Sequence, residues 1–182
     1  MRIIGTAGWS GSGKTTLLTR VIPKLVARGL RISTLKHAHH AFDVDEPGKD
    51  SYLHREAGAT EVLVASANRY ALRHELRGAP EPSVAELLGK LSPVDLVIVE
   101  GWKVARYAKI EVYRQEVGKT PLHPVDPYIR GVAADVPFPN AGRPVVALSD
   151  LEAVVALMLE ISEPLDTVMA RLTSPSPALV GT

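Results

Sequence analysis

A glycine-rich segment near the start of the chain constrains the fold most. Residues 8–15 read Gly-Trp-Ser-Gly-Ser-Gly-Lys-Thr and match the pattern G-x-x-x-x-G-K-[S/T] at every position. The β-rich run Arg2–Thr6 precedes this segment, and apolar residues recur at helical spacing from Lys14 to Ala27. A strand that passes through such a loop into a helix is the context in which this motif cradles a phosphate, so the sequence predicts a P-loop.

The chemistry of a phosphate cradle accounts for the residue types in this loop. Successive backbone N–H groups must point into one concavity, which requires backbone angles that glycine adopts without strain. The positive end of the following helix adds to the attraction for an anion. We expect Lys14 to reach the β- and γ-phosphates and Thr15 to ligate Mg²⁺. The predicted nucleotide-binding residues of the loop are Gly8, Ser10, Gly11, Ser12, Gly13, Lys14, Thr15 and Thr16.

Strands and helices alternate along the rest of the chain, which predicts an α/β fold. The run Asp95–Val99 is almost wholly apolar and is typical of a strand buried on both faces of a parallel sheet. Ser83 with Glu86 forms a capping box that opens a helix to about Leu91. We therefore predict a three-layer P-loop NTPase fold with a mainly parallel sheet, whose strand-end loops hold the whole site. Further strands are predicted at 31–35, 61–65, 69–73, 109–113, 129–133 and 145–148, and a further helix at 49–57.

Length and composition narrow the classes of protein that fit. With 182 residues, we predict one nucleotide-binding domain over 1–173 and a flexible tail over 174–182. A net charge of +1 gives no reason to expect nucleic acid or an acidic membrane surface as a partner. The absence of cysteine excludes disulfides, thiol nucleophiles and Cys-ligated metals. The sequence shows neither a signal peptide nor an apolar run of membrane-spanning length, so we expect a cytoplasmic protein.

A second carboxylate is needed if the P-loop is to hold a metal with its nucleotide. Glu100 ends the predicted buried strand and is followed by Gly101, at the sheet edge where ligands of open α/β sheets bind. Asp95, at the other end of the same strand, is about 16 Å away at roughly 3.3 Å per residue and cannot serve the same metal. We predict Lys14 and Glu100 as catalytic residues, and Thr15 and Glu100 as metal ligands.

The segment 36–51 also starts near this edge and is rich in His and Asp, which leaves several interpretations open. His37, His39 and His40 could bind a transition metal, as in a metal-insertion GTPase. One of Asp43, Asp45 and Asp50 could instead hold a metal-bound or catalytic water. The loop could also receive the acceptor of a small-molecule kinase, or be an ordinary solvated loop.

Three blocks together resemble the MobB family of molybdopterin-guanine dinucleotide biosynthesis adapters. These are the P-loop over 8–16, the block from Lys36-His37 through Pro47-Gly48-Lys49-Asp50-Ser51 to Ala57-Gly58-Ala59, and Glu100-Gly101-Trp102-Lys103. The likeness covers roughly residues 2–160, and the middle block is its most specific part. Trp102 stands where the family pattern has Phe.

The resemblance implies a GTP-binding protein, at most a slow GTPase, that helps the guanylyltransferase MobA attach GMP to molybdopterin and is often a homodimer. Kinship with dethiobiotin synthetase, whose Glu-Gly ligates magnesium, supports Thr15 and Glu100 as ligands and suggests Asp50 as a third. The preference for GTP rests on the resemblance alone, because the chain lacks an Asn/Thr-Lys-x-Asp guanine reader.

Two further roles remain to be assigned, a reader of the guanine base and a contact to the pterin phosphate. Asp150 is placed to accept from the N1 and N2 groups of guanine, although helix capping explains it equally well. Among the cations that could contact a pterin phosphate, namely Arg55, Arg69, Arg73 and Lys103, we retain Lys103 because it follows the Glu-Gly pair.

Overall fold

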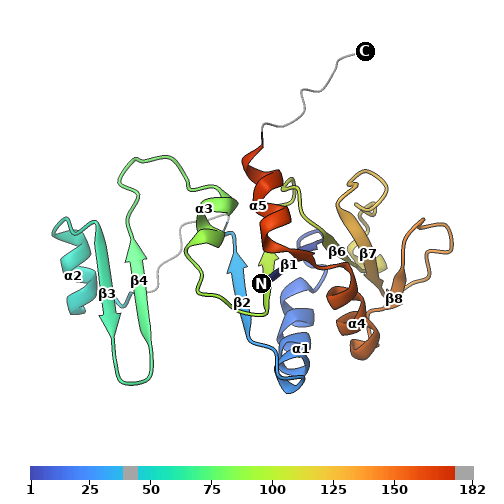
Figure 1. Ribbon diagram of the computed structural model, residues 1–182, viewed down its shortest axis with the longest axis horizontal. Helices are drawn as coiled ribbons and strands as arrows, with labels where there is room; N and C mark the ends of the chain where they lie inside the picture. Colours follow the sequence, from blue (N-terminus) through green and yellow to red (C-terminus); the bar gives the residue numbers. More distant parts are fainter. Residues whose placement is uncertain (39–44, 175–182) are drawn as a thin grey trace, which may run out of the picture. The chain divides into compact units, whose positions relative to one another are not determined.

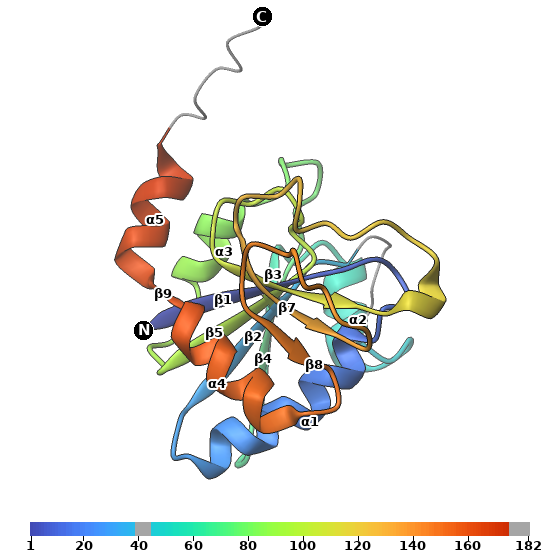
Figure 2. The ribbon, with the colours of Figure 1, turned by 90° about the vertical axis from the view of Figure 1, so that its right-hand side faces the viewer.

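The computed structural model describes residues 1–38 and 45–174 and divides the chain into two compact units. The first unit contains residues 1–37 and the chain from residue 84 onward, and the second contains residues 38–83. Figure 1 labels most of the helices and strands of the two units, and Figure 2 also labels β5 and β9. No helix in the described ranges is both long and apolar enough to cross a bilayer.

A seven-stranded, mainly parallel sheet forms the centre of the first unit, with strands in the order β2-β5-β1-β6-β7-β8. The short strand β9 pairs antiparallel with the start of β1. The register places Thr6 of β1 and Lys36 of β2 on either side of Glu100 in β5. The strands are β1 (Arg2–Ala7), β2 (Ile32–Lys36), β5 (Leu96–Glu100), β6 (Lys109–Tyr113), β7 (Ile129–Ala134), β8 (Val145–Ala147) and β9 (Glu163–Pro164).

Helices cover both faces of this sheet, which makes three layers (Figure 2). On one face, α1 (Lys14–Ala27) and α4 (Leu151–Ile161) enclose a core that includes Ile4, Ile98 and Ile110. On the other face, α3 (Val84–Gly89) and α5 (Leu165–Thr173) pack over a second core with Val97 and Val99. Alternate residues of β5 thus enter opposite cores, which explains why this strand reads as a continuous apolar run.

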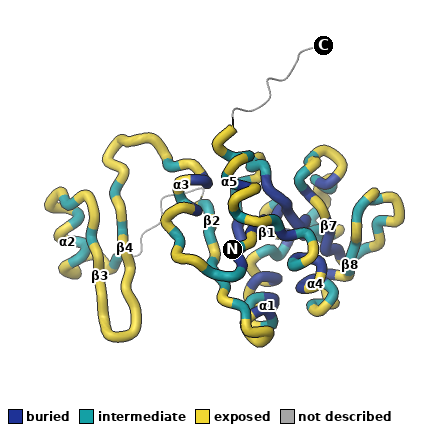
Figure 3. Tube along the Cα trace, in the orientation of Figure 1, coloured by how far each residue is buried: buried dark blue, intermediate teal, exposed yellow. Residues whose placement is uncertain are grey.

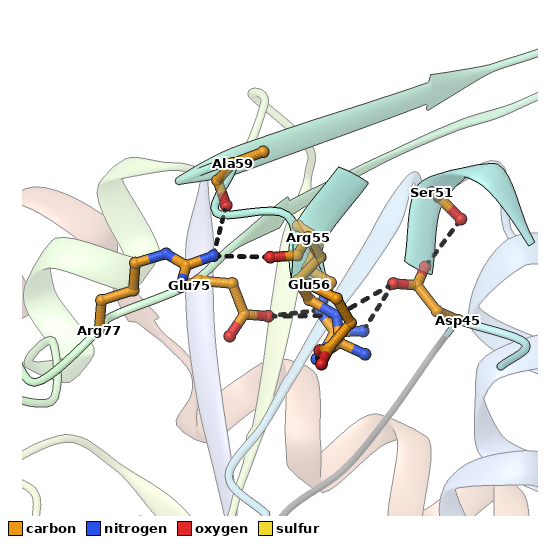
Figure 4. Close-up of polar contacts among 8 residues, drawn as sticks. Asp45, Ser51, Arg55, Glu56, Ala59, Glu75 and Arg77 are labelled. Atoms are coloured by element: carbon orange, nitrogen blue, oxygen red, sulfur yellow. Dashed lines mark hydrogen bonds and ion pairs between the residues drawn. The ribbon is translucent and has the colours of Figure 1, made fainter. Parts of the chain in front are cut away.

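The second unit holds α2 (Asp50–Glu56) and a two-stranded antiparallel sheet of β3 (Glu61–Ala65) and β4 (Tyr70–His74). None of its described residues is fully buried, as the tube in Figure 3 shows. Its most shielded charge is Asp45, whose carboxylate accepts from Ser51, Arg55 and Arg73 (Figure 4). Arg77 donates to the carbonyls of Arg55 and Ala59 in the same unit. Polar contacts therefore provide much of what holds this unit together.

The predicted three-layer α/β fold with a mainly parallel sheet is confirmed, and the predicted helix Lys14–Ala27 has the observed bounds. The main difference is that the strands expected near 61–65 and 69–73 do not enter the large sheet. They pair with each other in the second unit, where Leu63 faces Leu72 in register. β9, α5 and the 3-10 turn η1 (Gln115–Val117) were not predicted. Most of the predicted tail, residues 175–182, lies outside the described part of the chain.

Candidate functional site

The loop between β1 and α1 has the backbone of a phosphate cradle. Gly8 has φ +144°, and a Cβ there would lie 2.6 Å from both the Ser12 Oγ and the Val112 carbonyl oxygen. Gly13 has φ +85° and precedes the first residue of α1 in the left-handed region. Side chains at these two positions would be strained or would collide with backbone, so both glycines are required by the local geometry.

Polar groups of the loop are exposed or lack a partner among the described residues, and they could bind an anion. Ser12 is 2 % exposed, and its Oγ has no hydrogen-bond partner among the described residues. A buried hydroxyl without a partner is costly unless a ligand or water satisfies it. Ser10, Gly11, Thr15 and Thr16 are exposed along the same loop and the first turn of α1.

Lys14 is folded back over the loop that precedes it. Its Nζ donates to the carbonyl oxygens of Gly8 and Trp9, each at 2.9 Å. Partial burial lowers the pKa of Lys14, the Glu100 carboxylate opposes this shift, and the positive charges of Lys103 and Lys36 add to it. The two carbonyl contacts are weaker partners for an ammonium than phosphate oxygens, so this lysine is available to a polyanion.

Thr15 and Glu100 face each other across the predicted metal position. The Thr15 hydroxyl lies 3.5 Å from the Glu100 Oε1, although the two residues are 85 positions apart in the chain. One hydroxyl and one carboxylate oxygen are ligands that Mg²⁺ accepts, with water and phosphate oxygens completing the octahedron. These donors fit the predicted metal, and the remaining ligands would come from the nucleotide.

Gly101 allows the end of β5 to lie close to His37, the residue that follows β2. It has φ +112°, and a Cβ at this position would lie 2.6 Å from the His37 Cβ. The His37 amide also donates to the Glu100 carbonyl at 2.8 Å. The backbone at the end of β5, which carries Glu100, is therefore held against the residue that follows β2.

Other predicted residues have different surroundings. Lys103 lies over the Trp9 ring, with Nζ 5.3 Å from the ring centroid. The Asp150 carboxylate accepts from the Ala153 amide at 3.0 Å, so one of its oxygens caps α4. Asp50 is the first residue of α2 in the second unit, and its predicted role as a third metal ligand stays a prediction.

Of the three histidines in the metal hypothesis, His37 lies in the described part of the chain. His37 packs against Trp102 with ring centroids 5.0 Å apart. His39, His40 and Asp43 lie outside the described residues. Within residues 1–38 and 45–174, no three His, Cys, Asp or Glu side chains gather in a way that could hold a metal. Asp45, a candidate for holding a water, instead accepts from two arginines.

The sequence did not predict a buried, hydrogen-bonded carboxylate in the segment beside the P-loop. Glu111 of β6 is buried, and its carboxylate accepts from the Leu122 amide, the His123 amide and the His123 ring. The Trp9 indole donates to the Thr120 carbonyl at 2.8 Å, which ties the P-loop to the same segment. The one signal in the sequence was a Glu at the centre of an apolar strand, Ile110-Glu111-Val112.

Comparison with known proteins shows the family of the chain. The model for the family "Molybdopterin guanine dinucleotide synthesis protein B" (MobB) matches residues 3–135. The chain belongs to the MobB family. The predicted resemblance is thereby confirmed.

Two curated MobB relatives align over most of their length. The molybdopterin-guanine dinucleotide biosynthesis adapter protein of Escherichia coli is 42 % identical over 161 residues, which cover 87 % of this chain and 91 % of that protein. The adapter of Haemophilus influenzae is 43 % identical over 139 residues, or 75 % of this chain and 76 % of its own.

A solved MobB structure supports the fold. The MobB homologue of Bacillus stearothermophilus superposes with a TM-score of 0.65 at 26 % identity, covering 87 % of this chain and 97 % of that one. The likeness extends over nearly the whole of that structure, so the α/β fold with its mainly parallel sheet is like that of a MobB protein.

Proposed function

We propose that this chain is a GTP-binding adapter that helps the guanylyltransferase MobA attach GMP to molybdopterin, hydrolysing GTP slowly at most. The observation that carries this proposal is the Thr15–Glu100 pair beside the loop of Lys14 in a MobB-family chain. The adapter names of two relatives that are 42 % and 43 % identical support it. The predicted cytoplasmic location is part of the proposal.

Different residues of the site would bind the phosphates and the metal. The amides of the loop and the Lys14 ammonium would bind the phosphate oxygens. Thr15 and Glu100 would hold Mg²⁺, which when bound would neutralise charge on the β- and γ-phosphates. Glu100 would account for a metal, and the sequence motifs name no further residue as a general base, which supports slow hydrolysis.

Asp150 and Lys103 keep their proposed ligand roles. Capping α4 occupies one oxygen of the Asp150 carboxylate, and a carboxylate has about four acceptor positions. The second oxygen could therefore still accept from guanine. Lys103, which follows Glu100-Gly101-Trp102, would contribute a positive charge toward the phosphate of the pterin.

Titration calorimetry with GTP, ATP and their diphosphates, with and without Mg²⁺, tests the proposal. We expect GTP to bind more tightly than ATP, Lys14→Ala to weaken triphosphate binding, and Glu100→Gln to reduce the gain that Mg²⁺ provides. ATP preference, or fast transfer of the γ-phosphate to a small acceptor, would favour the kinase alternative. Phosphate release near 10 s⁻¹ without a partner would contradict the adapter role.

We also propose a homodimer, supported by the second unit. Leu63, Tyr70 and Leu72 are 62 %, 71 % and 57 % exposed on the β3–β4 hairpin. An isolated two-stranded hairpin is marginal in water, and its unpaired edges invite another strand. A second copy of the chain is the occupant we propose, because a two-fold axis lets identical edges and apolar faces pair with each other.

A further inference from the structure

Arg114 lies beside the P-loop although it comes from a different strand. It directly follows β6, and a Cβ on Gly13 would lie 3.1 Å from the Arg114 Nε and 3.6 Å from an Nη atom. Gly13 is the residue at which the loop turns into α1. The guanidinium therefore reaches the positive end of α1, where a phosphate group would bind.

The Arg114 guanidinium forms only a weak ion pair with another side chain among the described residues. The ion pair that it forms is with Glu116 at 4.0 Å, and the Glu116 side chain is mostly exposed. An exposed pair at that separation contributes little to stability. Among the described residues, no carboxylate closer than this one pairs with Arg114, so a cation held against a site that already attracts anions is better explained by an anionic ligand.

A carboxylate on the next strand holds the segment in place. Asp135, which follows β7, accepts from the Gln115 amide at 3.0 Å. The bond fixes the backbone directly after Arg114. Asp135 contacts the segment rather than the guanidinium, so it leaves the charge of Arg114 free for a ligand.

The sheet order sets the side from which Arg114 approaches. β1 lies between β5, which carries Glu100, and β6, which leads to Arg114. Neighbouring strands are about 4.8 Å apart. A diphosphate over the end of β1 would thus have the metal-binding carboxylate on one flank and the guanidinium on the other.

We propose that Arg114 donates hydrogen bonds to a diphosphate group held in the P-loop, on the flank opposite Glu100, with Asp135 as the residue that positions it. The inference rests on the proposed nucleotide site and adds a contact that needs neither Mg²⁺ nor the γ-phosphate. Guanidinium groups suit this role because their planar donors match phosphate oxygens in pairs.

GDP titrated calorimetrically in EDTA tests the contact, since it removes both the metal and the γ-phosphate. We expect Arg114→Gln to weaken GDP about tenfold or more, as loss of a charge-assisted hydrogen bond implies. Arg114→Lys should recover part of the affinity, and Asp135→Ala, which removes the acceptor of the Gln115 amide, should lose less than Arg114→Gln. Arg20→Gln on the exposed side of α1 is the charge-matched control and should bind as the parent does.

A second measurement distinguishes a contact of Arg114 with the ligand from a purely structural contact of Arg114 with Gly13. The thermal midpoint of the ligand-free protein should be the same for Arg114→Gln and Arg20→Gln. Unchanged GDP affinity in Arg114→Gln, or an affinity loss matched by an equal loss of ligand-free stability, would overturn the inference while leaving the nucleotide site intact. If the parent protein binds neither GDP nor inorganic pyrophosphate, the proposed function fails as well.

Discussion

Gly101 lies against His37 so closely that even one methyl group between them would not fit, since a Cβ at Gly101 would be 2.6 Å from the His37 Cβ. Glu100, the residue before this contact, has its carbonyl bonded to the His37 amide. The ends of β2 and β5 are therefore joined at the point where the proposed metal ligand leaves the sheet.

Gly101→Ala should accordingly destabilise the fold and disturb the metal position. The added methyl combines overpacking with a positive φ, and we expect a loss of about 2 kcal/mol or more in urea unfolding. Gly142→Ala is the matched control, because Gly142 also has positive φ (+66°) but its Cβ would meet nothing within 4 Å. Equal losses in the two variants would show that backbone strain alone matters and that the His37 contact does not.

The P-loop could be predicted from the sequence because its chemistry is local. Gly8 to Thr15 carry the spacing, the glycines and the lysine that the cradle needs, and α1 begins at Lys14 as predicted. Glu100 could also be predicted, since it ends an apolar strand that parallel packing requires to lie at the centre of the sheet.

The parts that could not be predicted depend on contacts between distant segments. Arg114 reaches Gly13 from the end of the strand beside β1, about a hundred positions later in the chain, and Glu111 bonds a segment that begins eleven positions later. The β3–β4 strands have the composition of sheet strands, and nothing local separates a hairpin of their own from membership in the large sheet. The absence of buried residues among residues 45–83 was visible only in three dimensions.

Nucleotide affinity should fall at alkaline pH through Lys14. Its pKa is lowered from the ordinary 10.5, so the ammonium is fully present below its folded pKa and is lost as the pH rises through that value. The nucleotide phosphates are already ionised there, so they do not contribute to the fall. We expect triphosphate affinity, followed by fluorescence titration, to decline at a lower pH than a free lysine would require. Lys14→Ala should bind weakly and lack this decline, whereas a decline of the same size in that variant would point to another group.

The lowered pKa of Lys14 should also make the free energy of unfolding of the ligand-free protein depend on pH. The unfolded chain binds a proton at Lys14 more readily than the folded chain, so the free energy of unfolding should rise slightly as the pH increases from the folded pKa toward 10.5. Lys14→Ala should remove this rise in ligand-free protein measured by urea unfolding.

Glu111→Ala should be among the most destabilising substitutions in the first unit. It would leave the amides of Leu122 and His123 and the His123 ring without their acceptor in a site from which water is excluded. Unsatisfied buried donors cost about 1–3 kcal/mol each, so we expect a loss of at least about 3 kcal/mol in urea unfolding. Glu116→Ala, on the exposed 3-10 turn η1, removes the same charge and should change stability little. A loss below about 1 kcal/mol in Glu111→Ala would mean that the segment is held by other contacts.

The proposed dimer can be tested on the hairpin itself. Leu63 of β3 and Leu72 of β4 face each other in register, and both are more than half exposed. Two charges in place of these leucines would have to be desolvated in an interface, while in a monomer they would remain in water at little cost. We therefore expect light scattering to give a dimer mass for the parent and a monomer mass for Leu63→Glu with Leu72→Lys, a pair chosen so that the charges attract across the hairpin. Val104→Glu alters an apolar residue that is 94 % exposed in the first unit and should remain dimeric. A parent protein that is monomeric at all concentrations would contradict the dimer. A double variant that stays dimeric would show that the hairpin is not the interface, because a self-complementary face must lose its partner when both copies change at once.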